Sequence, residues 1–137
     1  MTVVCTGIEH SGTGLLTRIV RTGIPHAMHR AMPHVDRHGR EHWWQPGIFE
    51  PARFIIIERD ADVWLRSTLR RGGTRGAALA RHGMARAALA GIEGYRLTYE
   101  ALVADPERTV GALGEWLGVT LRVPEPVYDG NALQVRA

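Results

Sequence analysis

The stretch CTGIEHSGTGLL, residues 5–16, joins a predicted strand to a predicted helix. The residues before Gly7 are apolar or β-branched, as in a buried strand, and those after Gly12 carry apolar side chains at helical spacing. The two glycines stand five residues apart, as in the phosphate-binding pattern G-x-x-x-x-G-K-[ST], but Thr13 and Gly14 replace its Lys and Ser/Thr. Main-chain N–H groups and the helix dipole attract an anion without any charged side chain. We therefore predict an anion-binding turn that does not serve a magnesium nucleoside triphosphate.

Strand and helix patterns alternate along the rest of the chain. The run FIIIE, residues 54–58, has the unbroken apolar character of a central parallel strand, and Asp60 is placed to cap the helix after it. This alternation predicts an α/β fold with a mainly parallel sheet in a single domain, residues 1–137. The other predicted elements are a strand at 2–5, a first helix closed by Gly23, a short strand near 24–29, an irregular segment to about 52, a helix at 75–90, a strand at 95–99 and a helix from Asp105 to Gly118.

Composition limits the class of protein. The chain has 45% apolar and 23% charged residues, as in ordinary globular domains. No apolar run reaches the ~18 residues that cross a bilayer, and the N-terminal stretch lacks the pattern of a signal peptide. The single Cys5 falls in a predicted buried strand, which suits a reducing compartment. We therefore expect a cytoplasmic protein without a membrane partner.

The basic residues are unusual because all 17 are arginine and none is lysine. Every permanent cation in the protein must therefore be an arginine, and only histidine can supply a proton-labile one. The net charge of +3 suits an anionic ligand, but it is too small and too evenly spread to indicate a nucleic-acid partner.

A second candidate anion site follows the central strand. In IIIERDADVWLRSTLRR, residues 55–71, Arg59 comes directly after the strand and Ser67 follows eight residues later. If the helix begins near Asp60, Ser67 lies about two turns along it, or ~10 Å of rise. The arginine and the serine could together hold one phosphate. The alternative is a surface arginine and a solvent-facing serine.

These segments together resemble the sulfotransferase family that uses 3′-phosphoadenosine-5′-phosphosulfate. The loop of that family, [KR]-S-G-T-[ST]-x-[LM], is similar to residues 10–16, and its arginine followed by a serine eight residues later is similar to Arg59 and Ser67. The stretch LTYEALVADPERTVGALGEWLGV, residues 97–119, is similar to a third family region, Y-E-x-L-x-x-D-P followed by a helix ending in Leu-Gly. The three segments keep the order they have in the family.

The resemblance implies a three-layer, P-loop-type α/β fold and transfer of a sulfuryl group to a hydroxyl or amine. It implies the donor nucleotide as cofactor, 3′,5′-ADP as product, no metal, and a small molecule, a glycan or a peptide as acceptor. The residues that it assigns to the nucleotide are His10, Ser11, Gly12, Thr13, Gly14, Leu15, Arg59, Ser67 and Tyr99.

The catalytic residues depart from the family at one position. His10 stands where the family has Lys or Arg, and we expect it to act as a cation that the neighbouring phosphates keep protonated, with Arg18 as the substitute. For the general base we expect His29 or His34, with Glu9 behind them; each of these histidines could instead be structural. The His-rich region lacks H-E-x-x-H and a pair of cysteines, so no metal site is expected.

Two other functions stay open. The substitution at His10 also fits a nucleotide-binding relative that has lost catalysis. A phosphotransferase of the nucleotide-kinase type shares the loop architecture, although it would normally need a lysine and a metal. The C-terminal stretch VYDGNALQVRA, residues 127–137, is interpreted as a remnant of a family segment that closes over the nucleotide.

Overall fold

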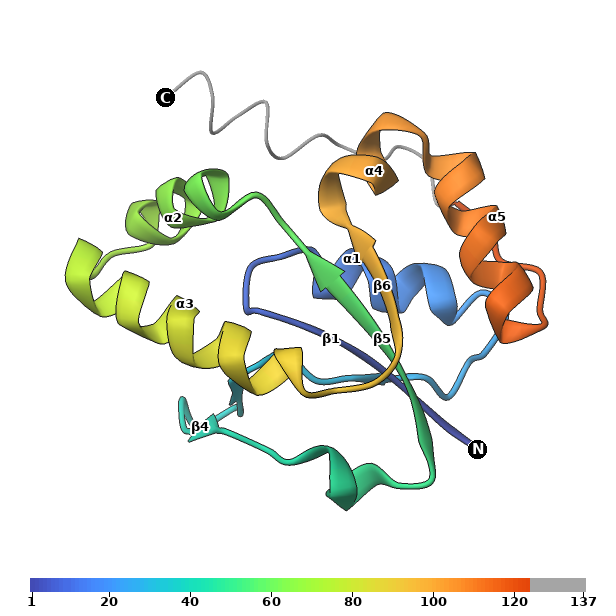
Figure 1. Ribbon diagram of the computed structural model, residues 1–137, viewed down its shortest axis with the longest axis horizontal. Helices are drawn as coiled ribbons and strands as arrows, with labels where there is room; N and C mark the ends of the chain where they lie inside the picture. The colour runs from blue at the N-terminus through green and yellow to red at the C-terminus, as the bar shows by residue number, and fades with distance from the viewer. Residues whose placement is uncertain (124–137) are drawn as a thin grey trace.

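The computed structural model of the protein describes residues 1–123, so the stretch at 127–137 lies outside the described residues. The chain forms an α/β fold with a parallel four-stranded sheet flanked by helices, as the alternation of patterns predicts (Figure 1). The strand order is β2-β1-β5-β6, with β1 and β5 at the centre. Their bounds are Thr2–Gly7 for β1, Met28–His29 for β2, Ala52–Glu58 for β5 and Tyr95–Thr98 for β6.

Apolar side chains cover both faces of the sheet. One face packs against three helices, α1 (Thr13–Val20), α4 (Tyr99–Ala104) and α5 (Pro106–Leu117). The other face packs against α3 (Arg75–Ala90) and the segment between β2 and β5, while α2 (Ala61–Arg70) connects β5 to α3. The central strands are therefore buried on both sides, which explains their continuous apolar sequences.

The connections between the parallel strands show where a ligand can bind at the sheet. The connection from β1 to β2 runs one way across the sheet on the α1 face, and the connection from β5 to β6 runs the other way on the α3 face. Because the two connections run in opposite directions on opposite faces of the sheet, both crossovers have the same hand. This agrees with the rule that crossovers between parallel strands are right-handed. The chain therefore leaves β1 toward one edge of the sheet and leaves β5 toward the other. Ligands of open α/β sheets bind beyond the carboxyl ends of the two strands at such a point.

The segment between β2 and β5 is more regular than the sequence predicts. It contains an antiparallel hairpin, with β3 at His34–Val35 and β4 at Glu41–His42, and a 3-10 turn, η1, at Pro46–Phe49. The carboxylate of Asp36 accepts hydrogen bonds from the N–H groups of residues 38 and 40 and so holds the hairpin turn. The prediction of an irregular segment is therefore wrong at the hairpin. Behind it, Trp44 is buried against Phe54 and donates its indole N–H to the carbonyl of residue 31.

The helix ends test the sequence patterns individually. Asp60 caps α2, and Gly118 closes α5 with a φ of 74°, so these two predictions are confirmed. Gly23 does not close α1, because the helix already ends at Val20 and Gly23 instead packs against the backbone of Thr120. The strand predicted at 95–99 stops at Thr98, whose hydroxyl caps the short helix α4.

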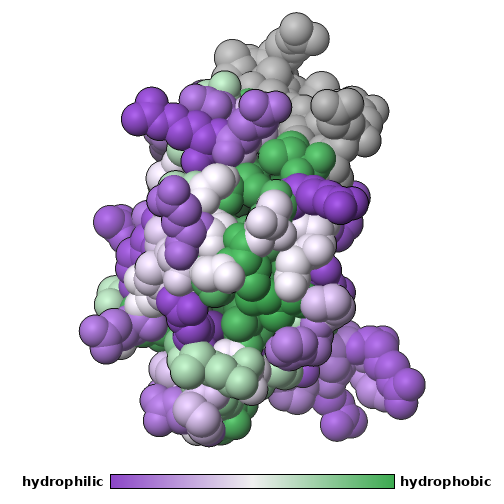
Figure 2. Space-filling view, turned by 90° about the vertical axis from the view of Figure 1, so that its right-hand side faces the viewer, coloured by the Kyte–Doolittle hydropathy of each residue, from purple (hydrophilic) through white to green (hydrophobic). Residues whose placement is uncertain are grey.

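Part of the outer surface is hydrophobic. Figure 2 shows a strip of hydrophobic surface on the side of the molecule that carries α5. Trp116, Val119 and Leu121 are only partly buried against the core. Within residues 1–123, none of the helices combines the length and the apolar character needed to cross a membrane.

Candidate anion-binding site

The turn between β1 and α1 has an unusual backbone conformation. His10 and Gly12 both adopt left-handed backbone conformations, with φ of 68° and 92°, and the N–H of Ser11 donates to the carbonyl of Ile8 at 3.1 Å. Gly7 lets the strand pass close to β5, since a Cβ there would lie 2.5 Å from the carbonyl oxygen of Ile57. Left-handed residues within a turn form concave arrays of N–H groups, the geometry that holds anions.

The start of α1 lacks a side-chain cap. The residue at the cap position is Gly12, which has no side chain, and Oγ1 of Thr13, the first helical residue, lies 3.0 Å from Nε2 of His29, within hydrogen-bond distance. The first N–H groups of α1 therefore have no side-chain acceptor, and an anion can take that place. The other α-helices of residues 1–123 are all capped by side chains, namely by Asp60, Thr74, Thr98 and Asp105.

Three segments that are distant in the sequence meet at this turn. Nη1 of Arg59 donates to the carbonyl oxygen of His10 at 3.0 Å, and the same guanidinium lies 4.9 Å from the ring centre of Tyr99. Tyr99 in turn closes over Gly12, where a Cβ would lie 2.7 Å from the ring atom Cδ2. The structure therefore brings Arg59 and Tyr99 to the predicted loop.

Helix α2 holds the turn from the other side. The indole N–H of Trp64 donates to the carbonyl oxygen of Glu9 at 2.6 Å. Ser67 follows one helical turn later on the same face of α2 and is only 6% exposed. The alternative of a solvent-facing serine is therefore wrong. Leu15, by contrast, packs its side chain against the core, so only its main chain can serve a ligand.

Burial, and to a smaller extent the nearby charges of Arg71, Arg81 and Arg59, lower the pKa of His10 from 6.5 to about 4. The imidazole is therefore neutral at pH 7. A cationic role for His10 therefore requires a bound anion that raises this pKa. Arg18 is exposed in the last turn of α1, away from the turn that precedes the helix.

Glu9 belongs to a small charge network. Its Oε1 lies 2.9 Å from Nη2 of Arg81 and 3.6 Å from Nε2 of His10, and Arg81 also pairs with Glu41. One guanidinium on α3 thus joins the loop to the hairpin. Arg81 is not predictable from the sequence, because its partners lie 72 and 40 positions away and one more arginine in an Ala- and Arg-rich helix gives no local signal.

The two candidate histidines differ in position. Nε2 of His29 reaches Thr13 at the loop, whereas His34 lies in the hairpin with its ring centre 6.3 Å from that of His42. Burial lowers the pKa of both, and the two interact electrostatically, since the charge of His34 lowers the pKa of His29. His29 is thus the histidine in contact with the loop. Among residues 1–123, no three side chains of the metal-binding types form a group.

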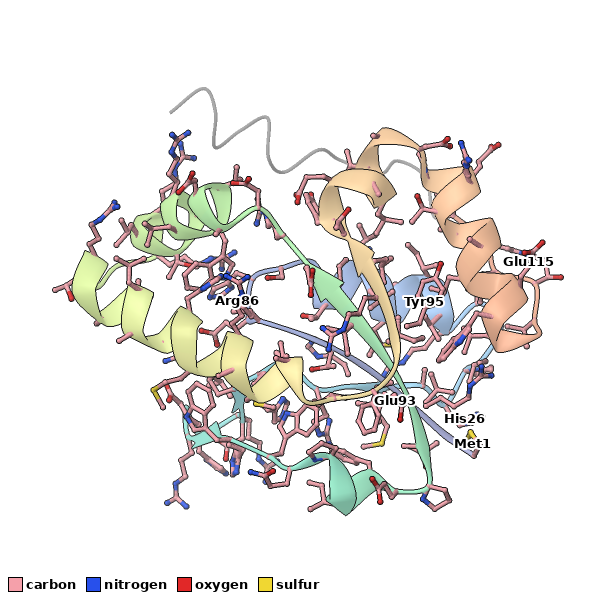
Figure 3. The ribbon with its side chains drawn as sticks, in the orientation of Figure 1. Met1, His26, Arg86, Glu93, Tyr95 and Glu115 are labelled. Carbon is pink, nitrogen blue, oxygen red and sulfur yellow. The ribbon has the colours of Figure 1, made fainter. Side chains whose placement is uncertain are left out.

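The loop lies between two pockets. One, of about 520 Å³, is lined by Ile8 and Arg59 together with residues of α3 and β6, and the other, of about 490 Å³, is lined by Glu9 and His10. Arg86 of α3, labelled in Figure 3, is exposed and lines the first pocket. His10 connects the two pockets, because its carbonyl oxygen accepts a hydrogen bond from Arg59 of the first pocket and His10 itself lines the second.

Comparison of the sequence with protein-family models gives no match. Comparison with curated proteins also gives no match.

Proposed function

We propose that the protein is a sulfotransferase that moves a sulfuryl group from 3′-phosphoadenosine-5′-phosphosulfate to a hydroxyl or amine acceptor. The observation that carries the proposal is the meeting of three sequence segments at one sheet end. Arg59 donates to the carbonyl of His10, and Tyr99 packs on Gly12. The same three segments carry the sequence resemblance to the family. The three-layer, P-loop-type description of the fold is part of this proposal, and the flanked parallel sheet is compatible with it.

In this proposal the donor nucleotide spans the loop and the first pocket. The uncapped N–H groups at the start of α1 hold the 5′-phosphosulfate, and the buried hydroxyls of Ser11 and Thr13 lie beside them. Arg59, which lines the first pocket, takes the 3′-phosphate together with Ser67 of α2, and Arg86 adds positive charge to that pocket, which Ser67 itself does not line. No lysine is needed, because arginines provide the positive charge. A phosphosulfate also requires no magnesium ion.

The proposed reaction forms one bond and breaks one. The acceptor oxygen or nitrogen attacks the sulfur, the bond from sulfur to the bridging oxygen of the 5′-phosphate breaks, and 3′,5′-ADP leaves with the added negative charge. The acceptor proton passes to a base within hydrogen-bond reach. Glu9 lines the second pocket and is our first candidate, while His29 contacts the loop through Thr13 and is the second.

His10 is proposed to respond to the donor. The negative charge of the 5′-phosphosulfate beside its ring would raise its pKa from about 4, against the effect of burial and the neighbouring arginines. The imidazolium would then stabilise the charge that develops on the leaving oxygen. If the pKa stays low when nucleotide is bound, the permanent charge of Arg59 must do this alone.

Calorimetry with two nucleotides tests the proposal. We expect 3′,5′-ADP to bind and Mg-ATP to bind at least tenfold more weakly. Arg59→Ala should weaken 3′,5′-ADP binding by roughly 10- to 100-fold, since a charge-assisted contact contributes about 1.5–3 kcal/mol. Arg66→Ala is the matched control, because Arg66 is exposed on the neighbouring helix and lines neither of the two pockets. Preferred binding of Mg-ATP, or an unchanged affinity in Arg59→Ala, would contradict the proposal.

The rival functions separate in the same experiments. A relative that has lost catalysis would bind 3′,5′-ADP but release no sulfate-labelled product in a transfer assay with a panel of phenols, sugars and amines. A nucleotide-kinase type of phosphotransferase would bind Mg-ATP instead. The low pKa of His10 is the observation that keeps the first rival open.

A further inference from the structure

The second pocket has features of a binding site for a small organic molecule. It lies between the loop at Glu9 and His10, the turn that joins α2 to α3, and Trp43 beside the hairpin. Its volume of about 490 Å³ falls within the range of ~300–1,000 Å³ typical of ligand sites. Because His10 also contacts the proposed donor site, a molecule in this pocket would face the sulfuryl group.

The charges of the pocket are unevenly distributed. Arg81 pairs with both Glu9 and Glu41, so these three residues carry a net charge of −1. Arg71 also lines the pocket, and the described part of the chain offers it no acidic partner. Arg71 therefore leaves an uncompensated positive charge in the pocket, and this charge also acts on His10.

A buried hydroxyl without a hydrogen-bond partner in the described residues lies near Arg71 in the sequence, on Thr68. Oγ1 of Thr68 is buried and has no hydrogen-bond partner among residues 1–123, and Thr68 lines the pocket together with Arg71. Buried hydroxyls without a partner are uncommon, because each loses the hydrogen bonds that water would provide. An anionic group on a bound molecule would accept from both Thr68 and Arg71.

The remaining wall of the pocket is apolar. Trp43 is half-buried and Met84 is 58% exposed, an unusual exposure for a large apolar side chain in the middle of a helix. The face of an indole and a flexible thioether both pack well against a flat ring. Several alanines of α3 leave room beside them.

We propose that this pocket binds the acceptor, and that the acceptor is a small hydroxylated ring compound carrying one anionic group, such as a carboxylate. The anionic group pairs with Arg71 and Thr68, the ring lies on Trp43 and Met84, and the hydroxyl points to His10 and Glu9. The assignment of the molecule as an acceptor rests on the proposed function. The binding of an anionic group by Arg71 and Thr68 is inferred from the pocket alone.

The test compares two probes that share a hydroxyphenyl group and end in either a carboxylate or a neutral hydroxyl. Calorimetry of the full chain without nucleotide uses 4-hydroxyphenylacetate and its neutral counterpart, 2-(4-hydroxyphenyl)ethanol. We expect the carboxylate to bind about tenfold more tightly, the preference that one charge-assisted contact provides. Arg71→Ala should abolish the preference, Thr68→Val should reduce it while keeping the side-chain shape, and Arg66→Ala should leave it unchanged.

The outcomes separate this inference from the proposed function. If the wild type shows no preference for the carboxylate, or if Arg71→Ala keeps it, the inference is overturned, whatever 3′,5′-ADP does. If the carboxylate binds through Arg71 but 3′,5′-ADP does not bind, the anion-binding pocket stands and the sulfotransferase assignment fails. In a functional enzyme, Arg71→Ala should raise KM for the carboxylate probe and leave KM for the neutral one unchanged.

Discussion

Replacement of Gly12 by alanine tests the conformation of the loop directly. Gly12 has a φ of 92°, and left-handed backbone costs a residue with a Cβ about 1–2 kcal/mol. The new Cβ would also lie 2.7 Å from Cδ2 of Tyr99, well inside van der Waals contact, so the ring or the loop must move. Overpacking of this kind costs about 1–3 kcal/mol. We expect Gly12→Ala to lower the free energy of unfolding by about 2–5 kcal/mol.

Urea unfolding followed by fluorescence measures this loss, and a second glycine gives the control. Gly14 lies in the first turn of α1 with nothing within 4 Å of its would-be Cβ, so Gly14→Ala should be neutral or stabilise the protein by up to ~1 kcal/mol. Tyr99→Ala removes the obstructing ring, and in that background Gly12→Ala should cost only the backbone term. If Gly12→Ala is as stable as Gly14→Ala, the loop does not have the described conformation.

Two other predictions concern titrating groups. Because folding lowers the pKa of His10 from 6.5 to about 4, the unfolded chain binds more protons between these values, so stability should fall as pH is lowered through this window. His10→Asn keeps a residue that tolerates left-handed backbone and should show a shallower fall in acid unfolding curves; identical curves would contradict the low pKa. Burial raises the pKa of Cys5 to about 11, so a thiol reagent at pH 8 should label the folded protein only as fast as it unfolds, and rapid labelling in native buffer would contradict the buried strand.

The parts of the fold predictable from sequence are those set by local patterns. The apolar run at 54–58 lies within β5, and Asp60 and Gly118 terminate helices by interactions with their own neighbours in the chain. Local patterns also mislead where tertiary contacts decide. Gly23 resembles a helix-closing glycine, but its position is set by the close approach of the chain at Thr120.

The candidate site divides in the same way. The loop and Arg59 follow strand ends, so the sequence alone places them at one edge of a parallel sheet. The pairing of Glu9 with Arg81 and the proximity of Arg71 to His10 depend on how α2 and α3 fold back over the loop. No spacing in the sequence encodes that approach.

Because the chain has no lysine, the permanent cations near the loop are arginines. A loop lysine is flexible and can lose its proton when buried, whereas the arginines that surround this loop cannot. Arg59 is held by the carbonyl of His10. A fixed cation of this kind needs little reorganisation when charge develops on a leaving oxygen, which favours catalysis. Burial and the neighbouring arginines lower the pKa of His10, so this imidazole is poised to gain a proton only when an anion arrives. A loop that substitutes histidine for lysine is therefore consistent with a donor site whose charge is completed by the nucleotide, and an NMR titration of His10 with and without 3′,5′-ADP would show whether its pKa rises toward neutrality.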